Sequence, residues 1–234
     1  MKILVVNADD FGYSRGINRG IIKAHEKGIV ASTSVMVTEP AAQEAKVLKD
    51  YKDLSVGLHF NITGESVRKR ILQKVKLIFE DIKTVEEEFK RQIDLFIGLV
   101  GRPPDHLDSH HHVHLHPKIK PIFEQYSREH QTPVRAFGEV NFVDEFFGWD
   151  RFSRPDLSRI SVKHLLRILS DLPGGVSELM CHPGFVDPGL KSSYAKEREV
   201  ELATLVDDRV AEFIVNSGIK LCNWREASLY LWNS

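Results

Sequence analysis

Short apolar runs alternate with longer amphipathic stretches from the first residues of the chain. Residues 3–7 ("ILVVN") form a continuous apolar run, which is typical of a parallel strand covered on both faces. Residues 16–28 follow with an apolar spacing near 3.6 and a final glycine, which predicts a helix. Residues 32–38 predict a second strand and residues 39–50 a second helix with Pro40 in its first turn.

The same alternation continues to the end of the chain. Residues 84–101 predict a helix, because Thr84 suits the N-cap, glutamates occupy the first turn and Gly101 follows the last turn. Further strands are expected at 54–63, 105–110, 133–138, 177–184 and 219–223, and further helices at 118–130, 160–172, 194–217 and 224–232. Residues 64–83 and 138–158 show no period and are predicted to be loops that cover a substrate.

This order of elements favours one particular fold class, an α/β protein. About seven strand–helix units without a Pro- or Ser-rich linker predict a single domain over residues 1–234, built as a distorted (β/α) barrel with a mostly parallel sheet. The length of 234 residues suits such a barrel, which commonly has about 250. An open, doubly wound sheet is the alternative that the pattern leaves open.

Composition narrows the classes of partner. The chain has 28% charged residues and a net charge of −1, which argues against a nucleic-acid partner. No apolar run reaches the ~18 residues of a membrane-spanning helix, and the N-terminal run is too short for a signal peptide. Two cysteines do not make a disulfide framework. We therefore expect a cytoplasmic protein without nucleic-acid or membrane partners, and a homodimer is possible.

Polar side chains that could catalyse a reaction or bind a metal lie where the predicted strands end. In parallel α/β folds, the carboxyl ends of the strands form the active site. Four predicted strands end in carboxylate, amide or imidazole side chains, namely Asn7, Asp9 and Asp10, then His59 and Asn61, then Asp108 and His110, and finally His182.

The adjacent carboxylates of Asp9 and Asp10 are the first candidate pair. Two carboxylates at a buried strand end repel each other unless a cation or a shared proton relieves them. A metal ligand beside a general base meets that need, since one carboxylate coordinates and the other remains free to take a proton. The alternative is a turn into the following helix, with Asp10 or Ser14 as its cap.

Residues 106–117 ("HLDSHHHVHLHP") contain six histidines, a density that indicates a metal site. If the strand continued through them, alternation would place Asp108, His110, His112 and His114 on one side. Three or four ligands suffice, so most of these histidines cannot bind one ion together. We expect His110 to be the ligand. The others would orient ligands, contact substrate or lead into the next helix, namely His111, His112, His114 and His116.

Asp10, His59 and His110 together make a set of one carboxylate and two imidazoles, which leaves metal positions open for water and a substrate oxygen. The two imidazoles favour zinc or another transition ion. His182, on another strand, is a candidate proton donor because an imidazole ordinarily titrates near neutrality.

Five motifs carry a resemblance to a known family. "NADDFG", "STS", "VGLHFNIT", "HLDSHHHVH" and "ELMCHPGF" occur in the order and spacing of the YdjC-like carbohydrate deacetylases, relatives of chitooligosaccharide deacetylase, from residue 3 to about 222. The resemblance implies a distorted (β/α) barrel that hydrolyses the N-acetyl group of an amino sugar with a divalent metal, often magnesium.

The resemblance also implies roles for individual residues. Asp10, His59 and His110 would be the metal ligands and His182 the general acid. Asp9 would be the general base, by analogy with other polysaccharide deacetylases in which the first Asp of the pair has that part. Asn7, Asn61 and His112 are expected to contact the substrate. Residues 64–83 are shorter and more basic than the family segment and 138–158 do not align, so the identity and chain length of the sugar stay open.

Two other functions compete with deacetylation. A metal-dependent phosphoesterase would also show an H-x-H-x-H pattern, which "HVHLH" satisfies at residues 112–116. A non-catalytic sugar-binding protein could keep the same fold, although it would have no use for a base beside a metal. A serine hydrolase is disfavoured because no G-x-S-x-G motif occurs.

Overall fold

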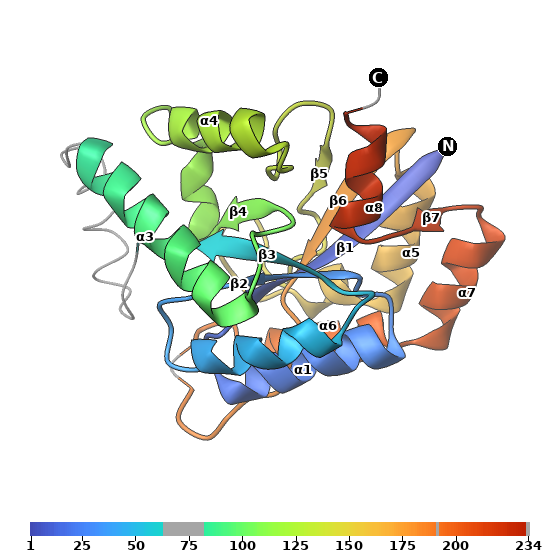
Figure 1. Cartoon of the computed structure of the whole chain (residues 1–234). Coiled ribbons are helices and arrows are strands. Elements are labelled where there is room, and N and C mark those ends of the chain that lie inside the picture. The colour runs from blue at the N-terminus through green and yellow to red at the C-terminus, as the bar shows by residue number, and fades with distance from the viewer. Residues whose placement is uncertain (63–81, 191, 233–234) are drawn as a thin grey trace.

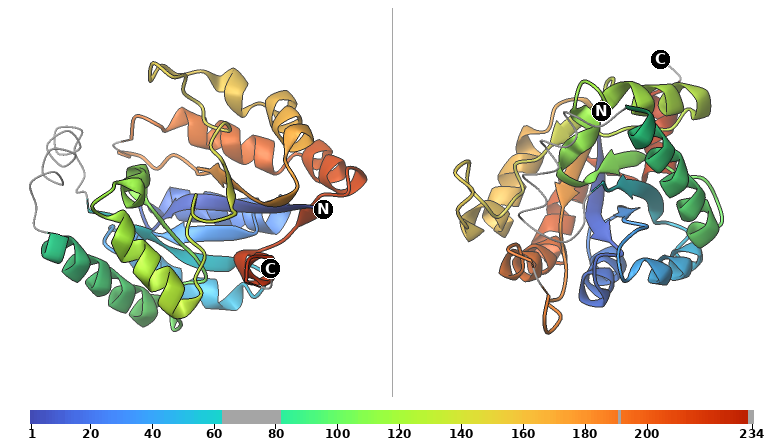
Figure 2. Two further views of the ribbon diagram at one scale, coloured as in Figure 1. Left: turned by 90° about the horizontal axis from the view of Figure 1, so that it is seen from above. Right: turned by 90° about the vertical axis from the view of Figure 1, so that its left-hand side faces the viewer.

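Within the residues that the computed structural model describes (1–62, 82–190 and 192–232), seven strands form one parallel sheet. They are β1 (Lys2–Phe11), β2 (Ser32–Val35), β3 (Ser55–Phe60), β4 (Leu107–Ser109), β5 (Asn141–Val143), β6 (Gly175–Cys181) and β7 (Lys220–Leu221). The order is β4-β3-β2-β1-β6-β5, and β7 pairs with residues near the start of β1. The sheet curls, with the helices on its outside, which confirms the predicted distorted (β/α) barrel (Figure 1 and Figure 2).

The α-helices described are α1 (Arg15–Lys27), α3 (Ile82–Val100), α4 (Lys120–His130), α5 (Val162–Asp171), α6 (Lys196–Leu205), α7 (Asp208–Asn216) and α8 (Trp224–Ala227). The 3₁₀ helices are η1 (Ala42–Asp50), η2 (His110–Leu115), η3 (Leu157–Ile160) and η4 (Ser228–Tyr230). Ser14 and Ser161 cap α1 and α5, since each side chain accepts a hydrogen bond from a first-turn backbone N–H. None of the helices in these described segments has the length and apolar content needed to cross a bilayer.

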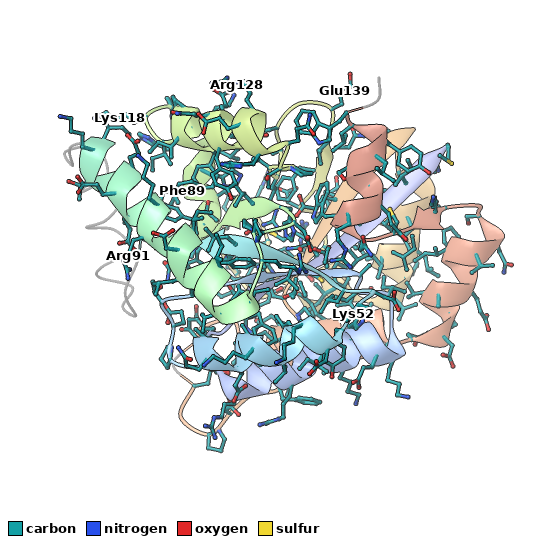
Figure 3. The ribbon with its side chains drawn as sticks, in the orientation of Figure 1. Lys52, Phe89, Arg91, Lys118, Arg128 and Glu139 are labelled. Carbon is teal, nitrogen blue, oxygen red and sulfur yellow. The ribbon has the colours of Figure 1, made fainter. Side chains whose placement is uncertain are left out.

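The main apolar core lies between the outer face of the sheet and the helices. Leu4, Val6 and Ala8 of β1 belong to this core and are fully buried. Phe89 of α3 packs against the ring of Phe123 of α4 at 4.8 Å between centroids. Figure 3 shows Phe89 between these two helices, whereas charged side chains such as Arg91 and Arg128 lie at the periphery.

The inner face of the curled sheet is polar over most of its depth. Strand alternation gives β1 the inner residues Ile3, Val5, Asn7 and Asp9. Ile3 and Val5 form a small apolar cluster with Trp224 at the amino-terminal end of the barrel. Beyond that layer most inner residues are polar, namely Asn7, Ser32, Ser34, His59, Asp108 and Glu178, and most of these bond to one another or to Arg135. We expected strands that are apolar on both faces. The outer face is apolar as expected, whereas the inner face is mostly polar and contains the site.

Three predicted elements differ in the structure. The second helix is the 3₁₀ helix η1, whose buried residues Ala42, Ala45 and Leu48 recur every third position, as a three-residue turn requires. The helix predicted at 194–217 is two helices, because Asp207 adopts an extended conformation and caps α7. Of the predicted loop at 64–83, residues 64–81 lie outside the described residues and 82–83 begin α3.

The fifth strand is also displaced. Its predicted segment 133–138 contributes a single parallel bridge between Val134 and Leu107. Positive φ angles at Ala136 and Gly138 (59° and 62°) turn the chain before it can continue in an extended conformation. The strand beside β6 is instead β5, which lies in the segment predicted to be a loop.

Candidate metal centre

A bulge at the end of β1 turns two consecutive carboxylates toward the same site. Regular alternation would send Asp10 to the outer face of the sheet, opposite to Asp9. The pairing of β1 with β2 shifts between Ala8 and Phe11, and Asp10 has a φ of 71°, in the left-handed region. Bulges of this kind re-aim side chains and are concentrated at functional sites. Here the bulge explains how adjacent residues both reach the barrel mouth.

Asp10, His59 and His110 meet at this mouth. Oδ1 of Asp10 lies 3.4 Å from Nε2 of His59 and 3.4 Å from Nδ1 of His110. One ligand atom from each residue falls within 4.8 Å of the others, a spacing that one ion could share. Oδ1 of Asp10 is buried and has no hydrogen-bond partner, an arrangement that a cation would satisfy. The three predicted ligands therefore form a set that fits a divalent metal.

Asp108 fixes the orientation of His59. Its Oδ1 lies 2.7 Å from Nδ1 of His59, which leaves Nε2 as the atom that faces Asp10. A carboxylate behind a histidine in this way sets the tautomer of a metal ligand. Although burial alone would lower it, Asp108 and Asp9 raise the pKa of His59 to about 10. The carboxylates thus give this pocket a strong preference for positive charge.

Arg198 of α6 holds the second oxygen of Asp10. Its Nη2 donates to Oδ2 of Asp10 at 2.5 Å, and both side chains are nearly fully buried. Burial alone would raise the pKa of Asp10, but the charge of Arg198 and the two nearby histidine rings hold that pKa well below its ordinary value. Asp10 is therefore an anion at neutral pH, with one oxygen fixed by Arg198 and the other directed to the histidines.

Arg135 holds Asp9 from below. It donates to Oδ2 and Oδ1 of Asp9 from Nη1 and Nη2, at 2.7 Å each, and Asn7 donates to Oδ1 at 2.8 Å. Burial would raise the pKa of Asp9, yet the Arg135 guanidinium outweighs burial and lowers it. Asp9 is thus ionised and rigidly oriented at the edge of the metal set.

A second group of potential ligands, Asp9, His59 and Asp108, lies deeper in the barrel. These carboxylates already share the buried guanidinium of Arg135, whose Nη2 lies 2.7 Å from Asp9 and 2.8 Å from Asp108. Ser34 also donates to Asp108 at 2.8 Å. A cation here would have to displace Arg135, so this second group is an ion-pair network that supports the site above it.

His182 faces Asp9 from the loop after β6. Its Nε2 lies 3.9 Å from Oδ2 of Asp9, and its backbone N–H donates to Glu201 at 2.5 Å. Burial lowers the pKa of His182 to about 4, although Asp9 and Asp10 act in the opposite direction. The side chain is therefore neutral at pH 7 in this structure. From the sequence we expected an imidazole whose pKa is near neutrality.

Close backbone packing positions the His182 loop. A Cβ atom added at Gly20 of α1 would lie 2.4 Å from the Cα of Gly184, and one at Gly16 would lie 2.3 Å from the carbonyl oxygen of Phe185. The glycines of α1 therefore let the helix contact the loop backbone directly. The loop is also tied to α6, since Gly184 N–H donates to the carbonyl oxygen of Arg198.

The open side of the site lies at His110 and His182. Their side chains are 23% and 13% exposed, whereas those of Asp10 and His59 are 3% and 2% exposed. Among these four side chains, solvent therefore reaches the site at His110 and His182.

The remaining histidines of the 106–117 run do not line up as an extended strand would place them. β4 ends at Ser109, and His111 and His112 have positive φ angles of 56° and 54°, which break the alternation. His114 turns away and bonds to Ser109 and to the carbonyl oxygen of Arg135. The ring of His111 packs on His110 at 3.8 Å, and His112 packs on Phe142 at 5.3 Å. His116 accepts a hydrogen bond from the Lys118 N–H.

The two asparagines predicted to contact substrate are buried and bonded. Asn7 donates to Asp9 and accepts from Ser32 at 2.6 Å. Asn61 donates to Glu39 at 2.7 Å, and its backbone bonds to Gln92. Asn7 lies directly against Asp9 and Asp108, and the contact of either asparagine with a substrate stays a prediction.

Several residues of this site were not assigned a role from sequence. The sequence could have indicated Ser34 and Asp108, because polar residues alternate along their strands. It could also have indicated Arg135, because this charged residue lies within the apolar run "PVRAF". No sequence pattern indicated Arg198 or Glu201, because the polar face of a helix normally meets solvent. In α6 the buried residues include Glu197, Arg198 and Glu201, so this polar face is turned inward.

The chain is similar to known proteins over nearly its whole length. The YdjC-like protein family matches residues 3–216. A carbohydrate deacetylase of Geobacillus stearothermophilus is 34% identical, over 96% of this chain and 98% of its own length. A chitooligosaccharide deacetylase of Serratia marcescens is also 34% identical, over 96% of this chain and 99% of its own.

Solved structures are similar over nearly the whole chain. A protein of Enterococcus faecalis V583, provisionally named a cellobiose-phosphate cleavage protein, superposes with a TM-score of 0.80 at 28% identity, covering 96% of this chain and 98% of its own. A family 4 carbohydrate esterase of Streptomyces lividans superposes with a TM-score of 0.56 at 13% identity, covering 95% and 91%. The similarity to the Streptomyces lividans esterase shows that the two proteins share a fold.

Proposed function

The chain belongs to the YdjC-like protein family, and we propose that it is a metal-dependent hydrolase that removes the N-acetyl group from an acetylated amino sugar or chito-oligosaccharide. The names of its deacetylase relatives support the reaction class. The observation that carries the proposal is a carboxylate, Asp9, held next to the Asp10–His59–His110 set yet outside it. Such a carboxylate serves as a base in hydrolysis.

Asp10, His59 and His110 would hold the metal ion. When bound, a divalent cation lowers the pKa of water and polarises the acetamide carbonyl. The family resemblance suggests Mg²⁺, whereas two imidazole ligands favour Zn²⁺ or another transition ion. The roles of the three residues are to present one carboxylate and two imidazole nitrogens toward the open side of the site, in orientations set by Arg198 and Asp108.

Asp9 is proposed as the general base. It would accept a proton from the water that attacks the acetyl carbonyl carbon. Because Arg135 keeps its pKa low, Asp9 is fully ionised at neutral pH. The same bonds fix its oxygens, so that little reorganisation is needed when the proton is transferred.

His182 is proposed as the general acid. It would protonate the departing nitrogen as the C–N bond breaks, which releases acetate and the free amine. Since His182 is neutral at rest, it must first gain the proton that it donates. Oδ2 of Asp9 is 3.9 Å away, so the proton taken from water has a short path to Nε2 of His182.

Asn7, Asn61 and His112 are retained as proposed substrate contacts. His112 is the most direct candidate, because its buried Nδ1 has no hydrogen-bond partner in the structure. A homodimer and a cytoplasmic location remain predictions from the sequence, and sedimentation and fractionation measure them.

The competing functions make different demands on the same residues. A phosphoesterase of the H-x-H-x-H kind needs its histidines together, but His114 is fully buried and bonded to Ser109 and to the carbonyl oxygen of Arg135. A binding protein without catalysis would hold the sugar and release nothing. Acetate release from N-acetylglucosamine and from acetylated chito-oligosaccharides, with Mg²⁺, Zn²⁺ or Co²⁺ added, tests the proposal. Sugar binding without acetate under every metal would refute it.

A further inference from the structure

A hollow of about 470 Å³ lies beside the His182 loop, within the segment that matched no family pattern in the sequence. Its lining includes the rings of Phe147, Trp149 and Phe152 and the carboxylates of Asp144, Glu145 and Asp150. The volume falls in the roughly 300–1,000 Å³ range of small-molecule sites, and a mixture of aromatic and a few polar groups is typical of them.

Phe147 joins this hollow to the candidate active site. Its ring contacts the ring of His182 edge to face, with centroids 5.6 Å apart. It also stacks on Tyr194 at 4.7 Å with the two planes nearly parallel, at 4°. A molecule in the hollow would therefore be next to one held between His110 and His182.

The aromatic wall is held in place before any ligand arrives. Trp149 donates from Nε1 to Glu197 at 3.1 Å, and the Gly148 N–H between the two aromatic residues donates to the Tyr194 hydroxyl at 2.6 Å. A Cβ at Gly148 would lie 2.9 Å from Glu197, so the backbone fits tightly there. A preformed wall binds with a smaller loss of conformational entropy.

A tight turn presents Phe152 at the outer edge of the hollow. Trp149 and Pro155 form an antiparallel bridge, and Asp150 accepts hydrogen bonds from the backbone N–H groups of Phe152 and Arg154. The Phe152 residue is 63% exposed, although its ring is among the largest apolar groups of the chain. The guanidiniums of Arg151 and Arg154 lie 4.7 and 5.0 Å from the centroid of this ring. A ligand that offers an apolar face could replace one of them on the exposed ring.

The charges around the hollow argue against an anionic ligand. Its lining has three carboxylates and two guanidiniums, those of Arg151 and Arg159. Arg159 is bonded to the backbone carbonyl oxygens of Phe147 and Glu145, and Asp150 pairs with Arg154 at 2.8 Å, so the residues around the hollow have no excess of basic charge. A phosphate would need an arginine cluster. Carboxylates and aromatic rings instead suit a neutral pyranose, whose hydroxyl groups donate hydrogen bonds and whose C–H face packs on a ring.

From these contacts we infer that residues 144–159 form a subsite for a neutral pyranose ring, linked to the ring whose acetamide group reacts at His182. The subsite rests on the proposed function, and it makes Trp149 and Phe152 determinants of chain length. The chain would then act on a disaccharide or longer oligosaccharide in preference to the monosaccharide.

Kinetics on two substrates test the subsite. Trp149→Ala and Phe152→Ala should each raise KM for an acetylated chito-disaccharide by about tenfold, equivalent to ~1.4 kcal/mol, and leave kcat nearly unchanged. Neither substitution should alter kcat/KM on N-acetylglucosamine. Trp232→Ala removes an exposed ring outside the hollow and serves as the matched control, with no effect on either substrate. Equal losses on both substrates, or no loss on the disaccharide, would overturn the subsite.

Binding without turnover separates the subsite from the reaction. Titration with the disaccharide should change the fluorescence of the wild-type protein and of Trp232→Phe, but not of Trp149→Phe. If that result is obtained and no acetate is ever released, the subsite stands and the proposed function fails. If fluorescence does not depend on Trp149, the subsite fails whatever the activity. Tighter binding of a phosphorylated disaccharide that is lost in Arg151→Ala would contradict a neutral ring.

Discussion

The guanidinium of Arg135 donates to both carboxylate oxygens of Asp9, at 2.7 Å each. The same group lies 2.8 Å from the carboxylates of Asp108 and Glu178. One buried cation is therefore shared by carboxylates from three strands inside the barrel. The planar fork of arginine can meet several oxygens at once, which the single nitrogen of lysine cannot do.

Two replacements of Arg135 should show how much of its contribution to the free energy of unfolding comes from its charge and how much from the forked shape of its guanidinium. Arg135→Met leaves buried carboxylates without their cation and should lower the free energy of unfolding by about 3–5 kcal/mol. Arg135→Lys keeps the charge but loses the fork, and a loss of about 1–3 kcal/mol is expected. Urea unfolding at pH 7 measures both. Arg209→Lys alters a similar forked pair with Asp207 whose arginine is 70% exposed, and it should have almost no effect. Equal losses at both sites would contradict this account.

Asp9 and His110 should affect different properties of the protein. Asp9→Asn keeps the Asp10–His59–His110 set, so it should retain metal while acetate release falls by roughly 10²–10⁴-fold. His110→Ala removes a ligand and should lose metal as well as activity. Elemental analysis of the purified variants, beside rates on an acetylated chito-disaccharide, distinguishes the two. An Asp9→Asn protein with near-normal turnover would refute its role as base.

The hydroxyl of Tyr194 links two segments around the site. It donates to Glu201, and it accepts from the Gly148 N–H at 2.6 Å. Tyr194→Phe leaves these buried groups without a partner and should lower the free energy of unfolding by about 1–3 kcal/mol. Tyr51→Phe removes an exposed hydroxyl that donates to Glu26, and it is the matched control with little expected effect. Unfolding curves that coincide for both variants would exclude a structural role for the Tyr194 hydroxyl.

His106 should make the fold sensitive to acid. It is 1% exposed and stacks on Trp224, and burial lowers its pKa from 6.5 to about 4. The unfolded chain therefore binds a proton at a pH where the folded chain does not. Stability from this residue is present above pH 6.5 and is lost as the pH falls toward 4, by roughly 3 kcal/mol.

A substitution at His106 tests that dependence. Both ring nitrogens are buried without a hydrogen-bond partner in the structure, so His106→Phe keeps the stacked ring and removes their desolvation. The variant should equal or exceed the wild type in stability at pH 7 and should lose less of it between pH 6.5 and 4. His130→Phe, at the exposed end of α4, should keep the wild-type dependence. An unchanged slope in His106→Phe would refute the assignment.

Gly20 should be sensitive to a single methyl group. An added Cβ would lie 2.4 Å from the Gly184 backbone, so Gly20→Ala must displace α1 or the loop that carries His182. We expect a loss of about 1–3 kcal/mol in the free energy of unfolding, together with reduced activity. Gly98→Ala, on α3 where nothing lies within 4 Å, should be neutral or stabilising. Equal behaviour of the two variants would contradict the close approach.

The sequence predicted the architecture, and it singled out three polar side chains that the fold brings together at the barrel mouth; that they bind a metal stays a prediction. Apolar spacing identified most strands and helices, and the strand ends brought Asp10, His59 and His110 together as expected. The alternation of strand residues failed to predict side-chain directions where the backbone leaves the extended conformation. Positive φ angles at Asp10, His111 and Ala136 redirect the chain, and no residue type there announces them. Arg198 was missed because it reaches Asp10 from a helix 188 residues away in sequence.

The polar inner face of the sheet has a consequence for how this protein can change. Its main apolar cluster packs between strands and outer helices, so few of the residues that face the barrel axis, chiefly Ile3 and Val5, contribute to apolar burial. Substitutions at those inward positions can then alter chemistry while the scaffold persists, provided that buried charges are exchanged as matched groups. Descendants of such a chain could acquire new reactions inside an unchanged shell.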